Sequence, residues 1–64
     1  MNTFSITNKH RGQSCRFDGY DNNQHFGKVV RVRHNIITVA YYIRGIDTEI
    51  VAHVPKTEHR ITVL

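Results

Sequence analysis

Hydrophobic and polar residues alternate along residues 26–55 in three runs rich in valine, isoleucine, threonine and tyrosine. Residues of these types favour β-strands, and the glycine and polar residues between the runs favour turns. The pattern therefore predicts three consecutive antiparallel strands, over 26–33, 36–44 and 49–55. Shorter alternating runs predict one further strand on each side, over 12–17 and 60–64.

Two predicted turns set the register of the three central strands. A two-residue turn at 34–35 gives these pairs: Val32 with Ile37, Val30 with Val39, and Val29 with Ala40. A four-residue loop over 45–48 gives these: Arg44 with Glu49, Ile43 with Ile50, and Tyr41 with Ala52. Both turns assign the same side chains to one apolar face, which we expect to form the core: Val30, Val32, Ile37, Val39, Tyr41 and Ile43.

The remaining segments complete a single small domain. Residues 1–11 are polar and predict a flexible or edge-strand N-terminal arm, and residues 12–64 form the domain itself. Pro55 ends the fourth strand because proline lacks a main-chain donor. Residues 56–59 are long enough for one helical turn before the last strand.

The order of these elements is that of an SH3-like small barrel. The run Gly27-Lys-Val-Val-Arg-Val, followed by Ile37-Thr-Val-Ala-Tyr, resembles the strand–turn–strand core of KOW and Tudor-type modules. The resemblance implies an all-β, five-stranded antiparallel barrel. The sequence has no aromatic cage like that of a Tudor methyl-ligand pocket.

Charge and cysteine content indicate the class of binding partner and the cellular compartment. Nine lysines and arginines against five acidic residues give a net charge of +4, which favours polyanions or acidic proteins as partners. The single cysteine, Cys15, rules out an intramolecular disulfide and favours a reducing cytoplasm. Without a long apolar run or a signal-like start, we expect a soluble intracellular protein that does not contact membranes.

The predicted register produces an outer sheet face with an apolar centre and a basic rim. The centre holds Val29, Ala40, Tyr42 and Val51, and the rim holds Arg31, Arg33, Arg44 and His53. Arginine beside an aromatic ring suits RNA or DNA, because guanidinium groups bind phosphate and a ring can stack on a base. In this hypothesis Arg31, Arg33 and Arg44 contact phosphates. Tyr42 and the loop residue Tyr20 stack on bases, and Lys28 and Lys9 add general attraction.

Two other interpretations of this face stay open. An apolar centre with arginine and tyrosine also suits a protein–protein interface, in a homodimer or in an adaptor or inhibitor of mobile-element origin. The face can also be an ordinary solvated sheet surface.

No sequence motif indicates catalysis, a metal or a cofactor. The five histidines do not stand at the close paired spacings of metal sites. Plasmid-borne type II dihydrofolate reductases are SH3-like chains of similar size, but their Val-Gln-Ile-Tyr binding segment has no match here. We therefore expect a non-enzymatic binding module.

Overall fold

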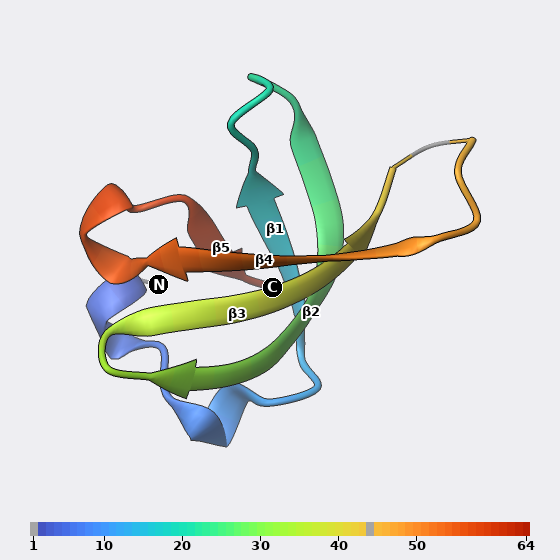
Figure 1. The fold of residues 1–64 in the computed structure, drawn as a ribbon. Coiled ribbons are helices and arrows are strands. Elements are labelled where there is room, and N and C mark those ends of the chain that lie inside the picture. Colours follow the sequence, from blue (N-terminus) through green and yellow to red (C-terminus); the bar gives the residue numbers. More distant parts are fainter. Residues whose placement is uncertain (1, 44) are drawn as a thin grey trace.

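The computed structural model describes residues 2–43 and 45–64, and most of these residues lie in β-strands (Figure 1). The strands are β1 (Ser14–Asp18), β2 (Gln24–Arg33), β3 (Ile36–Tyr42), β4 (Glu49–Pro55) and β5 (Ile61–Val63). The single-turn 3-10 helices are η1 (Thr3–Ser5), η2 (Asn8–His10) and η3 (Lys56–Glu58). The prediction of an all-β chain with a helical turn before the last strand is confirmed.

The five strands form one antiparallel sheet in the order β4-β3-β2-β1-β5. Strand β2 is paired on both sides: its first half pairs with β1 and its second half pairs with β3. Within the described residues β4 and β5 are the edges, so the sheet is open. Closure into an SH3-like barrel is therefore not confirmed.

The first hairpin turns where the sequence predicts. His34 and Asn35 have φ angles of 51° and 60°. Positive φ at both central residues is the geometry of a tight two-residue hairpin turn. Next to the turn the register is the predicted one, with Val32 opposite Ile37.

A β-bulge at Val30, earlier in β2, overturns the predicted pairing of Val29 and Val30. Val29 lies opposite Val39 instead of Ala40, and Val30 is the extra residue. Because a bulge changes the phase of a strand by one residue, Val29 is only 1% exposed while Val30 is 40% exposed. The predicted outward position of Val29 and the predicted core position of Val30 are both wrong. Lys28 takes the position opposite Ala40.

The N-terminal segment hydrogen-bonds to β2 beyond the end of β1. The Asn8 side chain donates from Nδ2 to the Val32 carbonyl (3.0 Å) and accepts from the Val32 N–H at Oδ1 (2.8 Å). Arg11 Nε donates to the carbonyl of Val30 (3.1 Å). These bonds satisfy main-chain groups that would otherwise form an open strand edge.

Residues 1–11, where the sequence predicts a flexible or edge-strand arm, carry η1 and η2 in the described part. Ile6 is fully buried in the core. Thr3 Oγ1 lies 2.7 Å from Nδ1 of His59, which joins η1 to the residue after η3.

The second hairpin pairs two residues away from the predicted register. Tyr42 lies opposite Glu49 and Tyr41 lies opposite Ile50. The predicted partner of Glu49, Arg44, lies outside the described residues. Strand β3 ends at Tyr42 and β4 begins at Glu49, so the described part of the connection, residues 43 and 45–48, is longer than the predicted loop over 45–48. A shift of two residues keeps every side chain on its predicted face, because side chains alternate with a period of two.

The core draws on all five strands and on the N-terminal segment. Its buried members are Ile6, Cys15, Phe17, Val29, Ile37, Val39, Val54 and Ile61. Cys15 is a free, buried thiol whose pKa is raised by its burial, as suits a core residue.

Gly27 lies where β2 and β3 approach closely. A Cβ atom at this position would collide with the carbonyl oxygen of Ala40 and lie 2.8 Å from Cβ of Tyr41. The absence of a side chain therefore permits the pairing of the two strands at this point.

We expect Gly27→Ala to lower the free energy of unfolding by about 1–3 kcal/mol, because the added methyl group forces the strands apart. Chemical denaturation measures this change. Ser14→Ala, at an exposed position in β1, is the control and should change stability by less than about 0.5 kcal/mol. A Gly27→Ala variant as stable as the parent would contradict the close approach.

Candidate functional site

The outer face of the sheet carries exposed apolar side chains on three strands. Phe26 on β2 is 62% exposed, Tyr42 on β3 is 56% exposed and Val51 on β4 is 52% exposed. Lys28, Ala40 and Val51 are cross-strand neighbours and form one row across this face. The outer face therefore holds Tyr42 and Val51, as in the predicted register, but not Val29. It also holds Lys28, which the predicted register would turn inward.

A shallow depression of about 480 Å³ lies on this face. Its lining comprises Ser14, Cys15, Phe26, Gly27, Lys28, Ala40, Tyr42, Glu49 and Leu64. Gly27 and Ala40, which also line it, have little or no side chain. Among the described aromatic contacts, neither Phe26 nor Tyr42 packs against another ring. Both rings can therefore contact a ligand.

Phe26 is the member of this site that sequence reasoning missed. The predicted register placed Val30 inward, and the same phase would place Phe26 inward. The bulge reverses the phase of β2 before Val30, so Phe26 and Lys28 lie on the outer face.

The other end of the outer face is basic. Arg31, Thr38 and His53 lie side by side on β2, β3 and β4. Thr38 Oγ1 is 2.9 Å from Nδ1 of His53, which fixes the ring on the sheet. Two hollows flank Arg31 and Arg33. One also holds His34 and His53, and the other holds Asn8 and Arg11.

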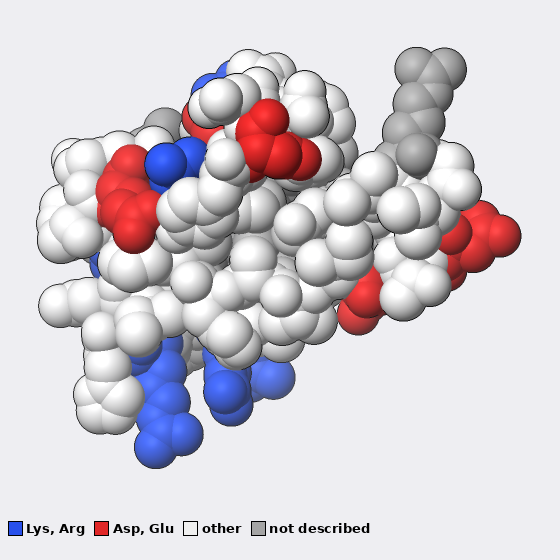
Figure 2. Space-filling model, turned by 45° about the horizontal axis from the view of Figure 1, so that its top comes forward, with Lys and Arg blue, Asp and Glu red and all other residues white. Residues whose placement is uncertain are grey.

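The cations of this end lack acidic partners. Arg16 pairs with Asp18 and Arg60 pairs with Glu58, elsewhere on the protein. Among the described residues no carboxylate lies within 4.0 Å of five other cations: Lys9, Arg11, Lys28, Arg31 and Arg33. Figure 2 shows Lys and Arg side chains projecting together from the lower edge, apart from the Asp and Glu side chains. Arg44, the third predicted phosphate contact, is not among the described residues.

Tyr20 belongs to a different cluster. Its hydroxyl donates to Glu58 Oε1 (2.7 Å), and the guanidinium of Arg60 lies 4.2 Å from the centre of its ring. The hydrogen bond to Glu58 raises the pKa of Tyr20 and lowers the pKa of Glu58. The structure thus ties Tyr20 to η3 and not to the outer face.

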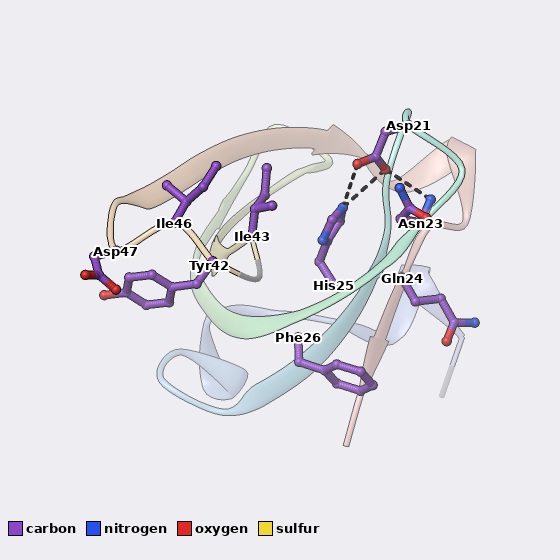
Figure 3. Close-up of a pocket in the computed structure, with 10 residues that line it drawn as sticks. Asp21, Asn23, Gln24, His25, Phe26, Tyr42, Ile43, Ile46 and Asp47 are labelled. Carbon is purple, nitrogen blue, oxygen red and sulfur yellow. Dashed lines mark hydrogen bonds and ion pairs between the residues drawn. The ribbon is translucent and has the colours of Figure 1, made fainter.

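A larger concavity, of about 780 Å³, lies between the loop after β1 and the loop after β3 (Figure 3). His25 is 9% exposed, lies 3.0 Å and 3.2 Å from the two Asp21 carboxylate oxygens, and stacks on Tyr41 at 4.8 Å. The pKa of Asp21 is lowered, first by the N–H of Asn23 and then by His25. In Figure 3 the rings of Phe26 and Tyr42 point away from each other at the rim.

Within the described residues no group of three or more His, Cys, Asp or Glu side chains could hold a metal ion. In the same part of the chain no helix is both long and apolar enough to cross a lipid bilayer. Comparisons with protein-family models, with curated proteins and with solved structures found no match to the chain.

We expect Tyr20→Phe to raise the pKa of Glu58 towards its ordinary value of 4.5, because the phenol hydrogen bond is the main cause of the lowering. A lowered pKa in the folded state stabilises the protein above about pH 4.5, and this stabilisation is lost as the pH falls through the folded-state pKa. The variant should therefore lose less stability on acidification.

NMR titration of the side-chain carboxyl carbons measures the pKa of Glu58 directly. Tyr42→Phe is the matched control, because its hydroxyl contacts Glu49 instead (3.4 Å). An unchanged pKa of Glu58 in Tyr20→Phe would show that the hydrogen bond does not control its ionisation.

Proposed function

We propose that this chain is a small non-enzymatic module that binds RNA or DNA through its outer sheet face. One observation carries the proposal: cations without acidic partners lie on the same face as exposed aromatic rings. Lys28, Arg31 and Arg33 follow Phe26 along β2, and Tyr42 lies on the neighbouring strand.

Nucleic acid provides the two chemical groups that this face can bind. Phosphates bind lysine and arginine and release condensed counterions, which gives affinity without sequence preference. Bases have flat aromatic faces that stack on phenylalanine and tyrosine. Guanidinium groups that already have carboxylate partners, such as Arg16, would contribute less.

The proposal also includes an SH3-like arrangement of the strands. Its support is the long β2 shared by both halves of the sheet, the two hairpins, and η3 directly before β5. The free, buried thiol of Cys15 supports a reducing, cytoplasmic setting.

A protein partner is the second candidate, and the exposed apolar residues favour it. Phe26, Tyr42, Val51 and Leu64 are each more than half exposed. Clustered apolar residues of this kind are common in homodimers and in adaptor or inhibitor interfaces. If the chain forms a homodimer, light scattering at high protein concentration should give twice the monomer mass. A monomeric mass would exclude the homodimer.

We expect Arg31→Ala/Arg33→Ala to weaken binding to mixed-sequence oligonucleotides roughly tenfold or more at 50 mM salt. The slope of log affinity against log salt should fall by about 1.4–1.8, since each lost phosphate contact removes about 0.7–0.9. Fluorescence anisotropy at several salt concentrations measures both quantities.

Arg31→Lys/Arg33→Lys is the matched control, because it retains both charges at the same positions. It should keep the salt slope of the parent and most of its affinity. Binding that is undetectable at 50 mM salt, or equal in the alanine and lysine variants, would overturn the proposal.

A further inference from the structure

The outer face is graded along the direction of β2. Three successive cross-strand rows cross it: Lys28 with Ala40 and Val51, then Arg31 with Thr38 and His53, then Arg33 with Ile36 and Pro55. The aromatic residues Phe26 and Tyr42 lie on the other side of the Lys28 row from Arg31. There Tyr42 pairs with Glu49. The face therefore changes from aromatic to basic along one strand.

The aromatic end carries a depression that is large enough for a flat ring. Phe26 and Tyr42 both line the depression, and so do Gly27 and Ala40, which contribute only main chain and one methyl group. Its volume of about 480 Å³ falls within the range of small-molecule sites, which is roughly 300–1,000 Å³. A planar base can thus reach an aromatic ring without moving a large side chain.

Charge sets the direction in which a bound strand would leave the depression. Glu49 lies at the aromatic end and would repel a phosphate group there. Lys28 lines the depression on the other side, and Arg31 and Arg33 continue from it along β2. Phosphates are therefore favoured from Lys28 towards Arg33.

We infer that the ligand is a single-stranded nucleic acid, with a base in the depression that Phe26 and Tyr42 line and the neighbouring phosphates on Lys28, Arg31 and Arg33. This inference rests on the proposed function. In a duplex the faces of the bases are covered by their neighbours, so an aromatic ring can stack only on a base that is unpaired or splayed out.

The length of the face sets the size of the site. Phe26 and Arg33 are seven positions apart in a bulged strand, or roughly 20 Å. An extended single strand of about four nucleotides covers this distance, which is at the lower end of the known range for small β-barrel domains that bind single strands.

Binding of a labelled mixed-sequence 12-mer, as RNA, as DNA and as the matching DNA duplex, tests the inference at 50 mM salt. The parent should bind a single strand more tightly than the duplex. Phe26→Ala and Tyr42→Ala should each weaken single-strand binding roughly 5- to 150-fold, because base stacking on an aromatic ring contributes about 1–3 kcal/mol. Neither change should alter duplex binding.

Three further variants control this test. Phe4→Ala removes an aromatic ring that is 50% exposed on η1, which is not part of the sheet, and should leave single-strand affinity unchanged. Tyr42→Phe keeps the ring and should retain binding. Phe26→Leu keeps apolar bulk without a ring face, so it should lose single-strand affinity. This variant replaces Phe26→Ala in the test if circular dichroism shows that Phe26→Ala does not fold.

The outcomes separate the inference from the function on which it rests. Equal affinity for strand and duplex, or a Phe26→Leu variant that binds the single strand like the parent, would overturn the inference and leave nucleic-acid binding in place. Absence of binding to all three ligands would overturn both and favour the protein interface.

Discussion

The bulge in β2 is the constraint on which the rest of the structure depends. It places Val29 in the core and changes the phase of the strand, so that the residues before it face the side opposite to the one that the turn alone predicts. Hydrogen bonds between the side chains of Asn8 and Arg11 and the main chain of the bulged half support this arrangement. Gly27 allows β3 to approach closely just before the bulge.

The composition of the outer face follows from this change of phase. In a regular strand ending at the same turn, Phe26 and Lys28 would point into the core, where a lysine is costly to bury. With the bulge both lie on the outer face. Lys28 then continues the line of cations from Arg33 and Arg31 along β2, and Phe26 lies near Tyr42. The proposed binding site therefore depends on a main-chain irregularity as much as on its side chains.

The sequence predicted correctly those features that depend on local residue types. The turn at His34 and Asn35 and the β-character of the runs were correct, because turn chemistry and β-branched residues are local signals. The bulge was missed because Val29 and Val30 have identical side chains, and the one local signal for it was Lys28, which a regular strand would bury. The burial of Ile6 and the partner of Tyr20 depend on contacts with distant parts of the chain. No local pattern encodes such contacts.

Chemical-shift mapping by NMR with a short single-stranded oligonucleotide tests the central claim most directly. The account predicts that the largest changes fall on the outer face, at Phe26, Lys28, Arg31 and Tyr42, with little change at Tyr20. Changes concentrated in the concavity beside His25, or spread evenly over the surface, would contradict the account and exclude the outer face as the binding site.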